Sequence, residues 1–223
     1  RQIGYLAGDP ALYRRMTGRQ LLGYLGRLRG LEGPGPGEAL AERLELDLSR
    51  PIGDLSRGNR QKVALVQAFM HHPRLLVLDE PTSGLDPLMQ REFYRLVAEA
   101  RDEGRTVFLS SHVLGEVERI ADRVGIVREG RLVVVEGLDT LKAKALRRVE
   151  IHFTAPVETA EFSSLPGVQD VAVEGSVLTC TAVGSVDGLI KAASRHEVAN
   201  LVTHEADLEE LFLRYYEGAG DAA

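Results

Sequence analysis

The chain has 223 residues, and 27 Lys and Arg against 33 Asp and Glu give it a formal net charge of −6. This balance gives no support to a nucleic-acid-binding surface or to a patch that binds anionic membranes. The single cysteine, Cys180, rules out an intrachain disulfide and is compatible with a reducing compartment. The longest aliphatic runs, 75–78 and 132–135, are far shorter than the roughly 20 residues that span a bilayer.

The first fifty residues predict a strand followed by helices. Ile3–Leu6 is a short apolar run typical of a strand. Thr17 is a candidate N-cap for a helix that extends to about Arg29, with its apolar residues on one face: Leu21, Leu22, Leu25 and Leu28. A turn-rich connector, 33–37, then leads to a second short helix, Glu38–Leu44.

From Ser56 the pattern becomes α/β. Helices and strands alternate, and their apolar residues follow the corresponding periods. The predicted elements are a helix Asn59–His71, a strand Arg74–Leu78, a helix Pro87–Glu103, a strand Thr106–Ser111, a helix from Val113 to Ala121, and a hairpin with strands Val124–Val127 and Leu132–Val135.

After Gly137 the pattern changes to that of a small α+β module. We expect a bridging helix, Leu138–Leu146, and then Val149–Phe153, Glu158–Leu165, Val168–Val173, Val177–Thr181, Val186–His196 and Val198–Thr203. Their βαββαβ order predicts a ferredoxin-like module. Asp207 caps a last predicted helix, whose apolar face is formed by Leu208, Leu211, Phe212 and Tyr215. We therefore place a domain boundary between residues 137 and 138.

Two segments point to nucleotide chemistry. The run Leu75–Leu78 ends in Asp79 and Glu80, and a buried parallel strand delivers such acids to the sheet edge at which α/β folds bind ligands. Asp79 can hold a metal ion there, and Glu80 can polarise a water. Upstream, Ser56-x-Gly58 opens a helix whose N–H groups and dipole suit a phosphate. Together they indicate a nucleoside triphosphatase, although helix caps and solvated acids would account for each segment taken singly.

At these residues the chain resembles the nucleotide-binding domain of ABC transporters. Leu55–Asn59 matches the family's signature loop (Leu-Ser-Gly-Gly-Gln) in three of five positions, with Arg57 and Asn59 as the departures. The other matches are Leu75–Asp79 to the Walker B strand, Glu80 to the catalytic carboxylate, Ser83–Asp86 to the D-loop and His112 to the switch histidine.

The resemblance implies a P-loop NTPase-like α/β core, residues 1–137, with a helical subdomain at about 10–55. It implies ATP and Mg²⁺ as cofactors, with Asp79 as the metal ligand, Glu80 orienting the attacking water and His112 contacting the γ-phosphate. The remaining nucleotide-binding residues would be Ser56, Arg57, Gly58, Asn59, Ser83, Gly84 and Asp86, with the signature loop facing ATP held by a second domain. The implied partners are that second domain, in a homodimer, and an integral membrane permease. The implied location is the cytoplasmic face of the cell membrane.

One motif of this family is missing. No Gly-x-x-x-x-Gly-Lys-[Ser/Thr] occurs in the sequence, so the loop and lysine that cradle the phosphates are absent. We expect the core to be N-terminally incomplete and the chain to be inactive alone. Ile3–Leu6 resembles the strand before the Q-loop, where Gly8 and Asp9 occupy the place of the family's glutamine.

The leading hypothesis is the ATP-hydrolysing subunit of an ABC exporter, similar to bacterial multidrug or antibiotic efflux systems. A second hypothesis is a soluble ABC-type ATPase without a transporter. A third is a degenerate, non-catalytic regulatory subunit, and the retention of both Glu80 and His112 argues against it.

Overall fold

The computed structural model describes residues 2–31, 35–144 and 146–204. The chain divides into two compact units, Arg1–Ile120 and Ala121–Ala223. This division places the hairpin that follows Ile120 in the second unit. The functional boundary that we place after residue 137 remains a prediction.

The first unit is built on a three-stranded parallel sheet. Its strands are β1 (Ile3–Leu6), β2 (Leu75–Asp79) and β3 (Thr106–Ser110), in the order β1-β2-β3. Side chains along each strand point alternately to the two faces of the sheet, and one face is buried. On the other face Ile3, Tyr5 and Phe108 are more than half exposed within this chain. The three predicted strands are confirmed, and they end side by side at one edge.

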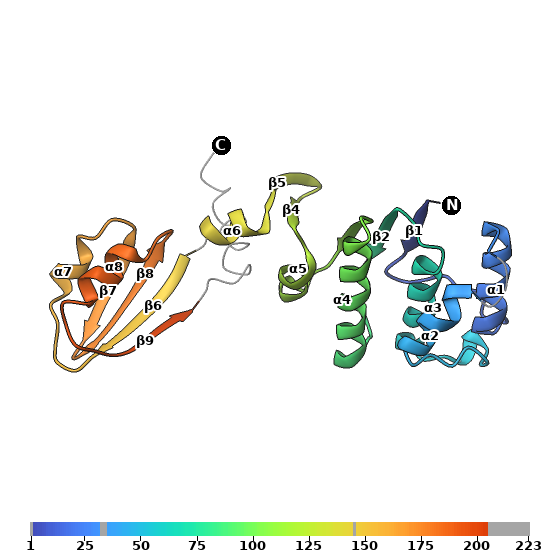
Figure 1. Ribbon diagram of the computed structural model, residues 1–223, viewed down its shortest axis with the longest axis horizontal. Coiled ribbons are helices and arrows are strands. Elements are labelled where there is room, and N and C mark those ends of the chain that lie inside the picture. Colours follow the sequence, from blue (N-terminus) through green and yellow to red (C-terminus); the bar gives the residue numbers. More distant parts are fainter. Residues whose placement is uncertain (1, 32–34, 145, 205–223) are drawn as a thin grey trace. The chain divides into compact units, whose positions relative to one another are not determined.

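The helices of the first unit can be followed along the chain in Figure 1. They are α1 (Gly18–Arg29), α2 (Gly35–Arg43), the short 3₁₀ helix η1 (Ile52–Asp54), α3 (Arg57–Phe69), α4 (Pro87–Asp102) and α5 (Leu114–Ile120). α1 begins as predicted, because the hydroxyl of Thr17 accepts from the Gln20 N–H at 3.2 Å while the Gln20 side chain accepts from the Thr17 N–H at 2.9 Å. It ends at Gly30, whose φ of 79° is a left-handed C-terminal cap.

Two predicted helix starts were wrong. The second helix begins at Gly35 rather than Glu38, because proline is tolerated in the first helical turn and does not force the connector to continue. The third begins at Arg57 rather than Asn59, because the Ser56 side chain caps it.

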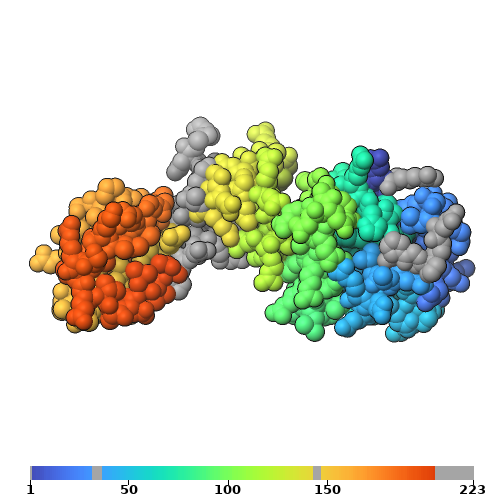
Figure 2. All heavy atoms as spheres, in the orientation of Figure 1, coloured from blue at the N-terminus to red at the C-terminus, as the bar shows by residue number. Residues whose placement is uncertain are grey.

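The core of the first unit lies between the sheet and its helices. The largest side chains that are fully buried there are Leu6, Leu21, Leu44, Ile52, Leu65, Leu76, Leu78 and Phe93. With all heavy atoms drawn, side chains fill the space that the ribbon leaves open between these elements (Figure 2). α3 packs so closely on β1 that a Cβ on Gly4 would lie 2.2 Å from the Ala68 carbonyl oxygen. The sheet edge is therefore held by a rigid, well-packed layer.

The second unit opens with an antiparallel hairpin, β4 (Arg123–Arg128) and β5 (Arg131–Gly137), followed by α6 (Leu138–Lys144). Glu129 and Gly130 both have positive φ, 49° and 74°, as a tight two-residue hairpin turn requires. The hairpin is confirmed. The predicted helix to Leu146 was too long, since Leu146 already pairs as a strand residue with Val183.

The remainder forms an antiparallel sheet with two helices. Its elements are β6 (Leu146–Phe153), α7 (Thr159–Ser163), β7 (Val168–Glu174), β8 (Val177–Val183), α8 (Asp187–Ala193) and β9 (Val198–His204), with strand order β7-β8-β6-β9. Ile151, Phe162 and Leu178 are fully buried in its core. The βαββαβ order is the expected one, while the ferredoxin-like class remains a prediction. The predicted helix after Asp207 lies outside the described residues.

Candidate functional site

Asp79 lies at the carboxyl edge of the parallel sheet, where β2 and β3 end in register with Asp79 opposite Ser110. The Ser110 hydroxyl donates to Asp79 Oδ1 at 2.6 Å, and the backbone N–H of Gly8 donates to Oδ2 at 3.2 Å. A Cβ on Gly8 would lie 3.0 Å from Oδ2, so the loop after β1 passes close against the carboxylate. Two neighbouring segments thus fix an exposed acid at the sheet edge.

Glu80 directly follows Asp79 and turns the chain sharply. Its φ of 46° is in the left-handed region, which costs a non-glycine residue about 1–3 kcal/mol. Its N–H donates to Ser110, and its carbonyl accepts from the amide of Gln61, a side chain that is 2% exposed. The Gln61 amide also donates to the Pro81 carbonyl. These bonds hold the strained backbone at Glu80.

Glu80 and His112 form a hydrogen-bonded pair. His112 Nδ1 lies 2.7 Å from Glu80 Oε2, although 32 residues separate the two in the chain. This hydrogen bond, and then the negative charge of Glu80, raises the pKa of His112. The predicted catalytic residues are therefore brought together at the edge that also carries Asp79.

Two predicted site residues act as helix caps. Ser56 Oγ accepts from the N–H of Asn59 at 3.2 Å, at the start of α3. Asp86 Oδ1 accepts from the N–H groups of Leu88 and Met89 at 3.0 and 3.1 Å, at the start of α4. The hydrogen bond from Met89, followed by that from Leu88, lowers the pKa of Asp86. The cap at Ser56 is the structural alternative that the sequence offered, whereas the cap at Asp86 was not predicted. Nucleotide contacts by these residues remain a prediction.

The signature-like segment and the D-loop-like segment touch each other. Arg57 Nη2 donates to Ser83 Oγ at 3.0 Å. Gly58 faces Gly84 so closely that a Cβ on Gly58 would lie 2.4 Å from the Gly84 carbonyl oxygen, and Gly84 itself has a φ of 76°. Arg57, one of the two departures from the family pattern, therefore links two segments of its own chain.

Sequence reasoning missed three polar residues that form hydrogen bonds to the segments around the site. Gln61 and Ser110 are polar residues inside elements that we predicted by their apolar pattern, so no local signal marked them. Glu116 did carry a signal, because it lies three residues after Val113 and four before Ile120, on the expected apolar stripe of its helix. It is 8% exposed, and its carboxylate accepts from the hydroxyls of Thr82 and Ser111.

Asp79 fits Mg²⁺ as a single ligand. Among residues 2–31, 35–144 and 146–204, no group of three or more His, Cys, Asp or Glu gathers in a way that could hold a metal ion. Mg²⁺ in nucleotide sites is commonly held by one or two carboxylates, with phosphates and waters completing its shell. One exposed carboxylate at the sheet edge is compatible with that mode.

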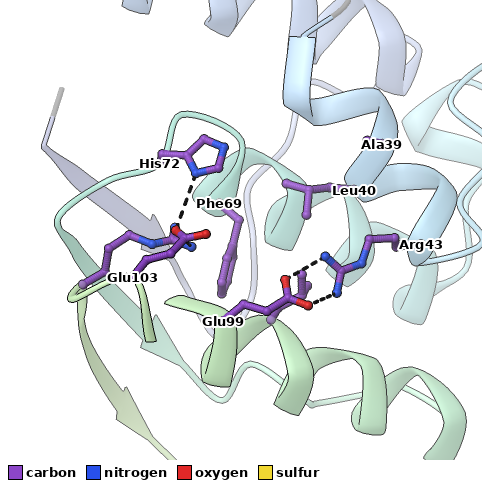
Figure 3. Close-up of a pocket in the computed structure, with 9 residues that line it drawn as sticks. Ala39, Leu40, Arg43, Phe69, His72, Glu99 and Glu103 are labelled. Atoms are coloured by element: carbon purple, nitrogen blue, oxygen red, sulfur yellow. Dashed lines mark hydrogen bonds and ion pairs between the residues drawn. The ribbon is translucent and has the colours of Figure 1, made fainter. Parts of the chain in front are cut away.

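A pocket of about 210 Å³ lies elsewhere in the first unit (Figure 3). Leu40 and Phe69 line it, and Arg43 forms two hydrogen bonds of 2.8 Å with the Glu99 carboxylate at its rim. None of the predicted site residues lines this pocket. We therefore locate the candidate site by its chemistry at the sheet edge.

None of the helices in the described part of the chain has the length and apolar character needed to cross a membrane. Residues 27–118 match the family model described as "AAA domain, putative AbiEii toxin, Type IV TA system". A solved structure described as an ATP-binding subunit of an ABC transporter is 31% identical, with a TM-score of 0.58, and the match covers 63% of this chain and 61% of that one.

Two curated relatives extend the comparison. The bacitracin transport ATP-binding protein BcrA of Bacillus licheniformis is 34% identical over 160 residues, which cover 69% of this chain and 51% of the relative. The fluoroquinolones export ATP-binding protein MT2762 of Mycobacterium tuberculosis is 30% identical over 217 residues, 95% of this chain and 67% of the relative. The chain thus spans about half of the first relative's length and two thirds of the second's. It belongs to the family of ABC transporter ATP-binding proteins.

Proposed function

We propose that this chain is the ATP-binding and ATP-hydrolysing subunit of an ABC exporter for a small molecule. The observation that carries the proposal is the Glu80–His112 pair at the carboxyl edge of parallel strands, next to Asp79. Phosphoryl transfer depends on positioning and on charge neutralisation. Glu80 and His112 would supply the positioning, and a cation held by Asp79 would neutralise phosphate charge. The relatives' names describe transport of bacitracin and export of fluoroquinolones, which supports the export role.

Each side chain has a distinct part in the proposed reaction. Glu80 orients the attacking water with its carboxylate, and His112 holds that carboxylate in place and donates toward the γ-phosphate. Asp79 would hold Mg²⁺, which neutralises phosphate charge when it is bound. The bond from Ser110 to Asp79 Oδ1 keeps the carboxylate at the edge where the phosphates would lie.

The start of α3 contributes in trans. α3 has 13 residues, and its first turn offers backbone N–H groups with the positive end of the helix dipole. We propose that Ser56, Gly58 and the neighbouring Arg57 face phosphates held by a second nucleotide-binding domain with an intact phosphate-binding loop. Asn59, Ser83, Gly84 and Asp86 would support that interface. The hydrogen bond between Arg57 and Ser83 would couple conformational changes at the two nucleotide sites of the dimer.

The same proposal covers partners and activity. Closure of two nucleotide-binding domains on ATP would drive a conformational change in an integral membrane permease. The chain would therefore lie at the cytoplasmic face of the cell membrane, in contact with that permease. The sequence contains no Gly-x-x-x-x-Gly-Lys-[Ser/Thr], so we propose that these 223 residues bind ATP weakly and are inactive by themselves.

The test combines purification with an ATPase assay. The tagged chain is purified alone and from detergent-solubilised membranes, and each sample is assayed with MgATP beside the variants Glu80→Gln and Glu174→Gln. Glu174 is an exposed carboxylate in the second unit and serves as the control. We expect no hydrolysis by the chain purified alone, because the loop Gly-x-x-x-x-Gly-Lys-[Ser/Thr] is missing from these residues. In the membrane sample we expect hydrolysis only where a partner subunit supplies that loop, and there Glu80→Gln alone should abolish it.

Two results would contradict the proposal. Hydrolysis by the isolated chain at an ordinary rate of about 1–10 s⁻¹ would refute the claim of inactivity. Equal activity of Glu80→Gln and Glu174→Gln in the complex would refute the role of Glu80. ATP hydrolysis without any membrane protein would favour the soluble ATPase instead.

A further inference from the structure

A buried carboxylate lies beside the candidate site without belonging to it. Glu116 is on α5 and is 8% exposed. Burying a carboxylate is costly unless its oxygens receive hydrogen bonds, so its presence in the interior calls for a structural or functional reason. Its hydrogen-bond partners provide that reason.

Two of the hydroxyl groups that Glu116 binds belong to the segments that carry the proposed catalytic pair, and a third is that of Tyr94 on α4. Thr82, two residues after Glu80, donates from Oγ1 to Glu116 Oε2 at 2.8 Å. Ser111, one residue before His112, donates from Oγ to the same oxygen at 3.1 Å. One carboxylate oxygen therefore ties the loop after β2 to the end of β3.

Ser111 extends this tie to the backbone around His112. Its hydroxyl also accepts from the N–H of Val113 at 3.0 Å, so His112 lies inside a turn that is closed by Ser111. An ionised carboxylate can only accept, so both hydroxyl protons must point at Glu116. That leaves the Ser111 lone pairs for the Val113 N–H.

We propose that Glu116 is a positioning residue, which joins the loop after β2 to the end of β3 and thereby keeps Glu80 and His112 in hydrogen-bond contact. Its catalytic consequence rests on the proposed function, but the positional claim does not. Glu116 touches neither substrate nor nucleotide in this proposal. It acts through Thr82 and Ser111.

The negative charge of Glu116 shifts the pKa of two neighbouring groups, Tyr94 and His112. Burial, followed by the negative charge of Glu116, raises the pKa of Tyr94 on α4. The Arg119 guanidinium lies 5.4 Å from the centre of the Tyr94 ring. The Glu116 charge also adds to the larger influence of Glu80 in raising the pKa of His112.

The test measures the Glu80–His112 contact directly, without nucleotide. NMR of the full chain with ¹⁵N-labelled histidine reports which ring nitrogen of His112 carries the proton and at which pH the ring titrates. In the wild type we expect a proton on Nδ1, bound to Glu80, and a pKa of His112 above its usual value of about 6.5. Glu80→Gln removes the carboxylate partner and should lower the pKa of His112. The size of that decrease is the reference for the other variants.

Two substitutions of Glu116 distinguish the effect of its hydrogen bonds from the effect of its negative charge. Glu116→Ala removes the acceptor, and we expect at least half of the pKa drop of Glu80→Gln together with loss of the Nδ1 signal. Glu116→Gln removes the charge but keeps an amide oxygen that accepts from both hydroxyls, so we expect the Nδ1 signal to be retained. Glu118→Gln removes another carboxylate from the same helix and serves as the matched control.

A folded Glu116→Ala variant with the wild-type Nδ1 signal and the wild-type pKa of His112 would overturn the proposal. An equal effect of Glu118→Gln would also overturn it, because the cause would then be charge alone. Should Glu116→Ala fail to fold, Thr82→Val and Ser111→Ala each remove one of the two bonds. If both leave His112 unchanged, the proposal is wrong. Since no ATP is present, these outcomes are independent of whether the chain hydrolyses it.

Discussion

The close contact between Gly58 and Gly84 predicts that adding one methyl group at position 58 lowers the stability of the first unit. In Gly58→Ala the new Cβ would lie 2.4 Å from the Gly84 carbonyl oxygen, whereas ordinary contacts begin at 3.4 Å. The two segments must therefore separate by about 1 Å, and neither can do so easily, because the oxygen belongs to the backbone of a tight turn with φ of 76°. Overpacking of this kind costs about 1–3 kcal/mol.

The control is a second glycine-to-alanine change in a helix. At Gly23, in α1, the nearest atom to an added Cβ is Arg27 Nη1 at 3.7 Å, which is ordinary contact. Alanine there should stabilise the helix by up to about 1 kcal/mol. The two substitutions add the same atom, so an opposite sign of their effects isolates the steric clash.

The assay is urea denaturation followed by far-UV circular dichroism. With a slope of about 2 kcal/mol per molar urea, the expected loss lowers the midpoint of the first unit's transition by about 0.5–1.5 M. A Gly58→Ala variant with the midpoint and slope of the wild type would refute the reasoning, and so would a Gly23→Ala variant that loses as much stability.

Three further predictions concern the first unit. Thr17→Ala removes the hydroxyl that accepts from the Gln20 N–H and should lower the free energy of unfolding by about 1 kcal/mol in the same assay, while Thr17→Ser should not. Phe93→Ala empties a site that is 0% exposed and should cost about 3–5 kcal/mol, against less than about 1.5 kcal/mol for Phe93→Leu if the core repacks. Asp86 has a lowered pKa, so its cap contributes stability above the ordinary carboxyl pKa near 4 and loses it as the pH falls. Melting temperatures between pH 6 and 2.5 should therefore fall less steeply in Asp86→Asn, and parallel curves for both proteins would contradict this reasoning.

Local patterns in the sequence were sufficient for the elements of the core. An apolar run followed by Asp79 and Glu80 predicted a strand that ends in two acids, and β2 ends at Asp79. The two short strands around residues 129 and 130 also followed from local residues, because the hairpin turn depends on neighbours in the chain. Two helix starts were misplaced by two or three residues, at Arg57 and Gly35, since such boundaries depend on single residues. The Ser56 cap itself was among the alternatives that the sequence offered, and it is confirmed.

The resemblance of five short segments also predicted the site residues before any contact was known. Sequence order placed Asp79, Glu80 and His112 at the ends of neighbouring strands, because parallel strands deliver their carboxyl ends to one edge. It could not establish that Glu80 and His112 bond directly, at 2.7 Å, because that depends on the left-handed turn at Glu80 and on the bonds from Ser110 and Gln61.

The tertiary structure alone decided how the segments meet. Arg57 contacts Ser83 across 26 residues, and Glu116 contacts Thr82 across 34, and neither pair is marked by any local pattern. The physical reason is that periodicity and capping act within a few residues, whereas burial of a carboxylate or the approach of two glycines depends on how α3, α4 and α5 pack on the sheet. The sequence by itself determined the chemistry available at the edge of the sheet, and packing determined which of those groups touch.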